Sequence, residues 1–323
     1  RGDWRGVIGA QHSDRDFSAL GDEAFVPPSD TSLSGLFFLQ ELQFDNWRLD
    51  GGLRIEDVDT RAADGRSAGH QPFSVSVGAL WHFDESSHIS LNLASAERAP
   101  GDQELFSDGP HVANQSFEIG DATLGEETSR SIELSYRRHA GRLTGSVTIY
   151  QNDFDDYIFL GDTGLEEDGF PVRQWQQQDA DFTGAEIELR YDIGDTALGH
   201  WQWNAFADVV RADFDNGNNV PRIPPRRIGM GLEWDRGCWA GSVDWIHASR
   251  QSRTAAFESS TDGYDQLDLN LSCQLAETNN GAWTVFLKGH NLLDEDIRNH
   301  TSFLKDQAPM IGRNFTVGAR VAW

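Results

Sequence analysis

The sequence has no long apolar run: 18 consecutive apolar residues do not occur anywhere in its 323 residues. A chain without such a run contains no candidate for a membrane-spanning helix. Only 38% of the residues are hydrophobic, and the mean hydropathy is -0.52. This low average does not exclude a β-barrel membrane protein, because barrel strands alternate apolar residues that face lipid with polar residues that face the lumen.

Positive charge is scarce. The chain has 26 Lys and Arg residues against 52 Asp and Glu residues, which gives a formal net charge of -26. Such a surface repels phosphate groups, so we expect no nucleic-acid partner. It attracts cations, although solvation of the loops would explain the same excess of carboxylates without any ligand.

Sequence signatures of catalysis are missing as well. There is no β-α-β alternation, no glycine-rich phosphate loop after a strand, no G-x-S-x-G and no C-x-x-C. Acid pairs such as Asp155-Asp156 do occur. Adjacent strand residues point to opposite faces, so such a pair does not act as a general acid and base on one substrate. We therefore expect no enzyme and no catalytic cofactor.

Cysteine is rare, since Cys238 and Cys273 are the only two. The alternation pattern puts them on neighbouring predicted strands, with Cys238 in the polar phase and Cys273 in the apolar phase. Side chains on opposite faces cannot be bridged without distortion, so the pattern predicts no disulfide.

Alternating strands are what the sequence has in abundance. The last stretch places Phe315, Val317, Ala319, Val321 and Trp323 on one face, between polar or small residues on the other. This is the period of a strand with one apolar face. The first ten residues also fit a strand and contain no leader or cleavage site, so we expect a fragment or a product of processing.

About fourteen such strands follow one another, and their connections alternate between short and long. Short turns are predicted near residues 45, 85, 140, 196, 236 and 279, and long loops near 18–32, 61–71, 98–128, 160–172, 214–225, 251–262 and 290–311. An outer-membrane barrel keeps its short turns at the periplasmic end and its long loops outside. The pattern therefore predicts an all-β, antiparallel transmembrane barrel.

Three stretches resemble the C-terminal barrel of TonB-dependent outer-membrane receptors: residues 97–106, residues 119–135, and the tail at 289–294 with 312–323. The resemblance implies that residues 1–323 are the C-terminal portion of a barrel of 22 strands, with the N-terminal plug and the first strands absent. It also implies a monomer that contacts outer-membrane lipid and lipopolysaccharide and is energised, through the plug, by the TonB–ExbB–ExbD complex.

A narrower resemblance is to the zinc-uptake receptors of that family, and it rests on residues 23–28, 107–118 and 298–309. It implies that Zn²⁺ is the transported ligand and that a histidine in a barrel loop helps to bind it at the extracellular mouth.

His111 is the best candidate for that histidine, with Asp108 three residues earlier, Glu104 on the preceding helical turn, and Glu23 in another loop. Imidazole and carboxylate are ligands that zinc accepts. His70, His290 and His300 also fall at predicted extracellular loop ends, and His70 and His300 are secondary candidates for ligands, although for each histidine alone solvent exposure or a hydrogen bond is the favoured explanation. The other six histidines are predicted to lie on the turn side or within strands, away from a capture site: His12, His82, His88, His139, His200 and His247.

Three other functions fit parts of the pattern. A siderophore, haem or cobalamin receptor would share the family signature. A passive porin would need only an even number of strands that close on themselves. A soluble β adhesin or enzyme would have to remain in solution without detergent.

Overall fold

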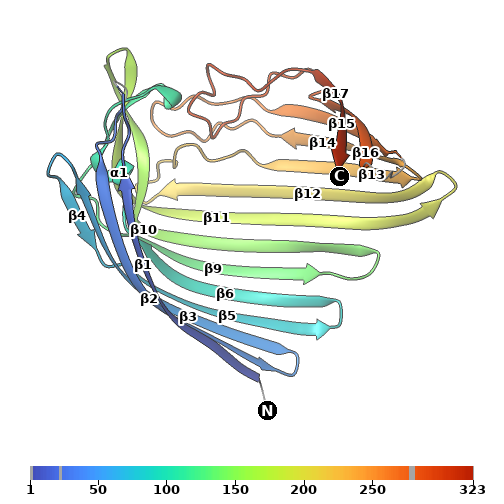
Figure 1. Ribbon diagram of the computed structural model, residues 1–323, viewed down its shortest axis with the longest axis horizontal. Helices are drawn as coiled ribbons and strands as arrows, with labels where there is room; N and C mark the ends of the chain where they lie inside the picture. The colour runs from blue at the N-terminus through green and yellow to red at the C-terminus, as the bar shows by residue number, and fades with distance from the viewer. Residues whose placement is uncertain (1–2, 22–23, 276–280, 323) are drawn as a thin grey trace.

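Antiparallel strands make up most of the protein. The computed structural model describes residues 3–21, 24–275 and 281–322. Within these ranges the fold is one sheet of 17 strands with one short helix, α1 (Asp102–Phe106), and one 3-10 turn, η1 (Val112–Asn114) (Figure 1). The predicted all-β class is confirmed.

Three of the 17 strands have four residues each and lie in loops: β4 (Ser67–His70), β7 (Asp108–His111) and β8 (Ser116–Ile119). The other fourteen form a curved wall, in the number that the alternation pattern predicts. They are β1 (Asp3–Phe17), β2 (Ser29–Phe44), β3 (Trp47–Ala62), β5 (Phe73–Asp84), β6 (Ser87–Arg98), β9 (Glu127–Arg138), β10 (Leu143–Glu167), β11 (Phe170–Thr196), β12 (Gly199–Phe214), β13 (Arg227–Arg236), β14 (Trp239–Ala248), β15 (Tyr264–Gln274), β16 (Ala282–His290) and β17 (Asn314–Ala322).

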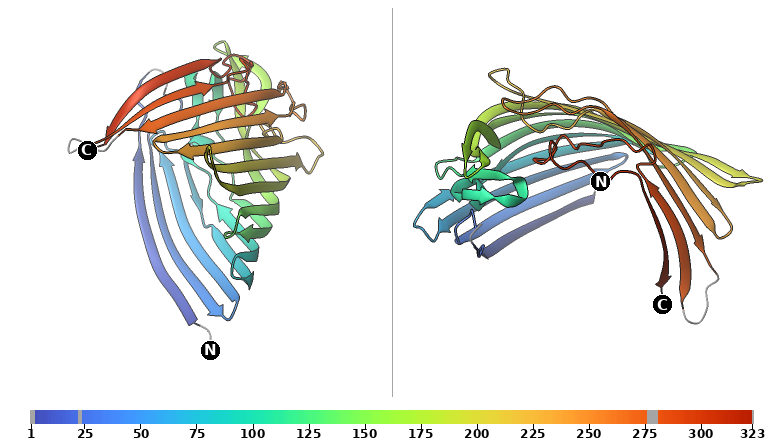
Figure 2. Two further views of the ribbon diagram at one scale, coloured as in Figure 1. Left: turned by 90° about the vertical axis from the view of Figure 1, so that its right-hand side faces the viewer. Right: turned by 90° about the horizontal axis from the view of Figure 1, so that it is seen from above.

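Each wall strand pairs in antiparallel fashion with the next wall strand along the chain, from β1 with β2 to β16 with β17. Seen from above, the sheet curls like the wall of a barrel, with β1 and β17 at its two edges (Figure 2). Among the described residues these two edge strands do not pair with each other, so the sheet is open.

The wall has an apolar outer face and a polar inner face, as the alternation predicts. On β3, Leu49, Leu53 and Ile55 point outward and are all exposed, with Leu53 at 46%. Arg54 points inward, where its Nη2 donates a hydrogen bond to Gln11 Oε1 at 3.0 Å. Exposed leucine and isoleucine side chains along a strand are the outer surface that a barrel presents to lipid.

The two ends of the wall differ in their connections. At one end, called here the turn end, segments of two to four residues join β2 to β3, β5 to β6, β9 to β10, β11 to β12, and β13 to β14. At the other, called here the loop end, every connection except that between β10 and β11 is long, and the longest span residues 99–126 and 291–313. The predicted segregation of short turns and long loops is confirmed apart from this one connection.

The prediction of an acidic loop at residues 160–172 is wrong. β10 continues to Glu167 and β11 begins at Phe170, so that only Asp168 and Gly169, both with positive φ, form the turn. This hairpin projects beyond the rest of the wall at the loop end (Figure 1). The apolar alternation stops where the hairpin leaves the wall, while the hydrogen-bonded ladder continues, so the sequence signal is lost before the strands end.

The prediction of no disulfide is also wrong, because Cys238 and Cys273 are joined, with their Cα atoms 4.8 Å apart. Cys238 lies in the two-residue turn before β14 and not in a strand. Strand alternation therefore does not govern the direction of its side chain. Trp239 is the residue opposite Cys273, and the amide of Gln274 donates to the carbonyl of Cys238, which brings the turn beside the end of β15.

Buried apolar side chains gather at the loop end, where the loops cover the ends of wall strands such as β10, β11 and β12. Leu105 and Phe106 of α1 are fully buried and pack with Leu124 and Ile158 at the loop end. No helix in the described ranges is long and apolar enough to cross a membrane.

Candidate functional site

The loop of residues 99–126 folds onto the wall through α1 and the small β7–β8 ribbon. The carboxylate of Glu104 accepts a hydrogen bond from the amide of Gly101 at 2.6 Å, which closes the first turn of α1. β8 then lies parallel to β11, with Phe117 opposite Val172. These contacts hold the ribbon over the loop end.

His111 and Glu118 meet on one face of this ribbon. His111 is opposite Ser116, and Glu118 is opposite Gly109, so all four residues share a face. His111 Nδ1 lies 2.8 Å from Glu118 Oε1. Asp108 belongs to the other face of the ribbon, opposite Ile119, and is exposed. The structure therefore brings His111 to Glu118 and not to Asp108.

Glu118 is a buried carboxylate with polar partners. Its side chain is fully buried. Oε2 accepts a hydrogen bond from Gln103 Nε2 at 2.8 Å, and Oε1 accepts from Ser116 Oγ at 3.2 Å and from Asn114 Nδ2 at 3.1 Å. A buried carboxylate is costly unless hydrogen bonds or positive charge compensate it. These three donors are neutral, which leaves His111 as the partner that can carry or recruit positive charge.

One tautomer of His111 fits this arrangement. An ionised carboxylate can only accept hydrogen bonds, so a neutral His111 would carry its proton on Nδ1 and donate it to Glu118. Asn114 Nδ2, which lies 3.0 Å from His111 Nδ1 and 3.1 Å from Glu118 Oε1, would then donate to the carboxylate. Nε2 then carries a lone pair, and it has no hydrogen-bond partner in the part of the chain that the structure describes. The ring is stacked on Phe25 with centroids 4.2 Å apart, which fixes its plane.

The remaining predicted ligands are not gathered around His111. Glu104 forms a two-pronged ion pair with Arg98, at 2.8 and 3.1 Å, and Arg98 also binds Glu127. Glu23 lies outside the described residues. Within the described ranges, no three His, Cys, Asp or Glu side chains are arranged to hold a metal ion.

His70 and His290 have internal partners. His70 is buried, and its Nε2 lies 3.0 Å from the carbonyl oxygen of Leu124. His290, at the end of β16, has its Nδ1 3.0 Å from Asp268 Oδ2. Both contacts connect a loop or strand end to its neighbour.

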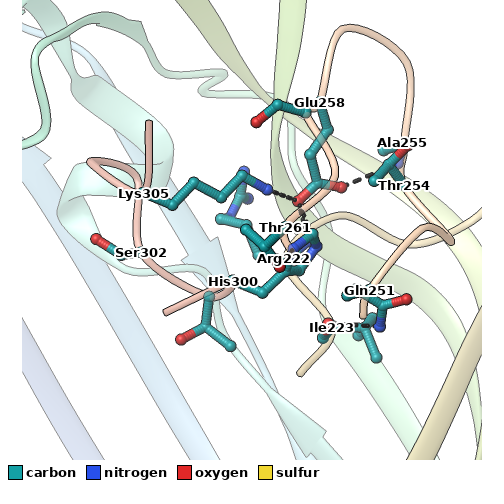
Figure 3. Close-up of polar contacts among 12 residues, drawn as sticks. Arg222, Ile223, Gln251, Thr254, Ala255, Glu258, Thr261, His300, Ser302 and Lys305 are labelled. Carbon is teal, nitrogen blue, oxygen red and sulfur yellow. Dashed lines mark hydrogen bonds and ion pairs between the residues drawn. The ribbon is translucent and has the colours of Figure 1, made fainter. Parts of the chain in front are cut away.

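His300 is the centre of a buried group that we call the mouth network, formed with Thr261, Glu258 and Lys305 (Figure 3). Its Nδ1 lies 2.9 Å from Thr261 Oγ1 and its Nε2 lies 3.2 Å from Glu258 Oε1, to which Lys305 Nζ donates at 2.9 Å. Burial alone would raise the pKa of Glu258, but hydrogen bonds from His300, Lys305 and the Ala255 amide lower it to about 2.

The mouth network holds two long loops together, since Glu258 and Thr261 belong to one and His300 and Lys305 to the other. A third loop joins through Arg222, whose amide donates to Glu258 Oε1 at 3.0 Å. The ring centroid of Phe303 lies 4.3 Å from the guanidinium carbon of Arg222 and 4.6 Å from that of Arg173. Burial lowers the pKa of Arg222.

Sequence reasoning missed Glu118 as the partner of His111. The available signal was the alternation of side chains along two short strands joined by a bend. It puts residues 111 and 118 on the same face only if the bend occupies residues 112–115. A four-residue strand carries too little pattern for this register to be predicted.

The protein is similar to receptors of known structure. The copper transporter OprC superimposes with a TM-score of 0.80 at 19% identity, over 98% of this chain and 54% of that one. The FrpB iron transporter from Neisseria meningitidis superimposes with a TM-score of 0.69 at 14% identity, over 91% of this chain and 46% of that one. The ferric citrate transporter FecA superimposes with a TM-score of 0.67 at 18% identity, over 98% of this chain and 50% of that one. At these identities the likeness concerns the fold, and the chain spans about half the length of each structure.

A curated relative is the hemoglobin and hemoglobin-haptoglobin-binding protein B of Haemophilus influenzae, which is 31% identical over 115 residues, or 33% of this chain and 10% of the relative. The family model of the TonB dependent receptor-like β-barrel matches residues 1–292. That match covers most of the chain and agrees with the wall of antiparallel strands, the apolar outer face and the segregated turns and loops. The chain therefore belongs to the TonB-dependent receptor-like β-barrel family, whose barrels lie in the bacterial outer membrane.

Proposed function

We propose that this chain is the C-terminal barrel portion of an outer-membrane receptor that binds Zn²⁺ at its extracellular mouth and imports it into the periplasm. The loop end is then the extracellular mouth, and the turn end faces the periplasm. The observation that carries the proposal is the His111–Glu118 pair, which is held in an extracellular loop with His111 Nε2 free of protein partners among the described residues.

The pair has the form of a metal ligand with its supporting carboxylate. Histidines that bind metals usually donate their second ring N–H to a carboxylate or carbonyl, which fixes the tautomer and makes the other nitrogen a better ligand. Glu118 accepts from His111 Nδ1 in this way. A cation at Nε2 would also supply the positive charge that the neutral donors around Glu118 do not.

The site would be partly exposed, because 24% of the His111 side chain is accessible. A transport site has to release its ion, so few ligands with water in the remaining positions suit it better than a closed site. The net charge of -26 favours cations near the mouth by long-range attraction.

Import would depend on partners outside this chain. Family membership supports a receptor energised by the TonB–ExbB–ExbD complex over a passive porin-like barrel, and we propose that the coupling passes through a plug that the chain does not include. We further propose that the receptor acts as a monomer in contact with outer-membrane lipid and lipopolysaccharide.

Calorimetric titration with Zn²⁺ tests the site on the whole protein, purified in detergent from outer membranes. We expect saturable binding that weakens about 10–100-fold in Glu118→Gln, the usual effect of removing a supporting carboxylate, and at least as much in His111→Ala. His12→Ala is the matched control. His12 is an exposed strand histidine bound to Asp14, so its removal should leave zinc binding unchanged.

Two outcomes would contradict the proposal. Zinc binding that His111→Ala leaves intact would remove His111 from the site. Absence of saturable zinc binding together with tight binding of a ferric chelate or haem would assign the receptor to the alternatives that the names of its relatives suggest.

A further inference from the structure

Three histidines lie together at the turn end, far from the proposed capture site. His82 is near the end of β5, His88 is the second residue of β6, and His139 is in the turn that follows β9. His82 and His88 are directly opposite each other in the ladder, and the amide of His139 donates to the carbonyl of Ser86 at 2.8 Å. Three separate segments thus bring one imidazole each to a single place.

Their rings are in contact. The centroids of His82 and His88 are 5.4 Å apart, and those of His88 and His139 are 6.2 Å apart. The outward positions beside them hold Trp81 and Ile89, so His82 and His88 face the lumen. The group, which we call the rim triad, lies on the inner wall at the periplasmic exit of the barrel.

The rim triad differs from every other histidine of the chain in its hydrogen bonds. The remaining seven each have a polar partner: His12, His70, His111, His200, His247, His290 and His300. Among the described residues, no hydrogen bond involves a ring nitrogen of the triad, and Nδ1 of His88 is buried without a partner. A buried polar atom is costly without a partner, and water or a metal ion would each satisfy this one.

The spacing of the rings suits a metal ion. Two imidazoles on one tetrahedral zinc, with Zn–N bonds of about 2.0–2.1 Å, have ring centroids about 5 Å apart. The distance between His82 and His88 is close to this, and that between His88 and His139 is slightly longer. As the side chains stand, no three ligand groups in the described ranges meet at one point, so the exposed His139 would have to turn toward the ion.

We propose that the rim triad is a second binding site for a divalent transition-metal ion, placed where the ion leaves the barrel for the periplasm. The inference rests on the proposed function only in naming Zn²⁺ as the ion. The three imidazoles would bind any divalent ion that prefers nitrogen ligands.

The surroundings make this a weak site. Arg137 is directly opposite His88, and the positive charges of Arg137 and Arg48 act on that imidazole. These positive charges repel a bound ion. Weak binding at an exit allows the ion to pass on to the periplasm, whereas a tight site would retain it.

Cobalt(II) tests the proposal, because its visible absorption reports tetrahedral coordination by nitrogen. The whole protein is titrated as the His111→Ala variant, so that the proposed capture site is silent. We expect one saturable cobalt site, whose affinity falls at least about tenfold when His88→Ala is added. Adding His247→Ala instead, which removes a histidine bound to Asp265, should leave the cobalt spectrum unchanged.

Absence of a cobalt spectrum in the His111→Ala variant would overturn the rim site, and so would a spectrum that survives His88→Ala. Circular dichroism of each variant establishes that the barrel is intact. Capture at the mouth is measured as the zinc binding that the unmodified protein loses on His111→Ala, and the rim site as the cobalt binding that remains in His111→Ala, so failure of one proposal is distinguishable from failure of the other.

Discussion

At the extracellular mouth, His70, His111 and His300 each contact a carbonyl, a hydroxyl or a carboxylate of another segment. At the periplasmic rim, the rings of His82, His88 and His139 lie beside one another and make no hydrogen bond to the described residues. At the mouth these contacts join loops to one another and to the wall. At the rim, neighbouring strands already fix the backbone, and the imidazoles are free to take a ligand.

The means of cross-linking differ in the same way. At the mouth, buried ion pairs and hydrogen bonds join loops that share no β ladder. At the rim, the Cys238–Cys273 bond joins a turn to a strand that is already in the sheet. A histidine at the mouth can therefore be needed for folding of the loops, whereas a histidine at the rim can be removed without loss of structure.

The largest effect should come from Glu258→Ala at the mouth. It would leave the buried Lys305 ammonium and His300 without their carboxylate, and removing one partner of a buried ion pair costs about 3–5 kcal/mol. We expect the loops at 249–263 and 291–313 to open locally, seen as faster amide hydrogen exchange there and unchanged exchange in the wall.

Asp262→Ala is the matched control in the same loop, because the Asp262 side chain is 91% exposed and lies 3.8 Å from Arg250. Equal exchange in the two variants would show that the mouth network does not hold the loops, and the contrast between mouth and rim would fail.

Acid should open the same loops without any substitution. The pKa of Glu258 is lowered to about 2 in the folded protein, from an ordinary value near 4.5. A lowered pKa stabilises the folded loops fully above pH of about 4.5, and this contribution of about 3 kcal/mol is lost as the pH falls toward 2. Hydrogen exchange, corrected for its intrinsic pH dependence, should be constant from pH 7 to 5 and increase below that. Opening already at pH 6 would assign control to a histidine instead.

Between the two ends, the stability of the wall should depend on which of its faces is substituted. Leu53→Arg would place a charge in lipid and cost about 2–4 kcal/mol if it lies near the midplane. Arg54→Leu, on the lumen face, should be mild. Denaturant unfolding of the barrel in lipid vesicles compares the two, and equal costs would contradict the assignment of faces.

A smaller effect is expected at the rim from Cys238→Ser. Loss of a disulfide typically costs about 2–4 kcal/mol. We expect the lower end, about 2 kcal/mol, because β14 keeps its ladders to β13 and β15. The midpoint of thermal unfolding measures it, with and without reductant. If reductant lowered the thermal midpoint of Cys238→Ser as much as that of the unmodified protein, the stabilisation would not come from the Cys238–Cys273 disulfide.

The strands could be predicted from the sequence because their signal is local. Apolar and polar residues alternate within a stretch such as residues 315–321 because each wall strand has lipid on one side and the lumen on the other. The alternation no longer predicts the structure where a strand leaves that environment. At Glu167 the hairpin has left the wall, and at Cys238 the strand has become a turn, so the pattern there misplaced both an element and a side chain.

The candidate site was predicted only in part because its contacts are not local. His111 could be chosen from its loop and its resemblance, but Glu118 is placed by β8 lying beside β11, more than fifty residues further along the chain. The sequence predicts that the three histidines of the rim triad lie on the turn side, and the structure places them there. Only the pairing of β5 with β6 brings two of those imidazoles opposite each other.

The smallest effect expected is that of Phe303→Leu at the mouth. The ring contributes two cation–π contacts, to Arg173 and Arg222, in addition to its apolar surface. Leucine keeps most of that surface, so the loss should be about 1 kcal/mol. Such a loss makes local opening about fivefold more frequent, which trypsin cleavage after Lys305 would report. Phe257→Leu, at a side chain that is 74% exposed, should leave the cleavage rate unchanged. Equal rates for the two variants would mean that the ion pairs of the mouth network hold the loop without help from the aromatic ring.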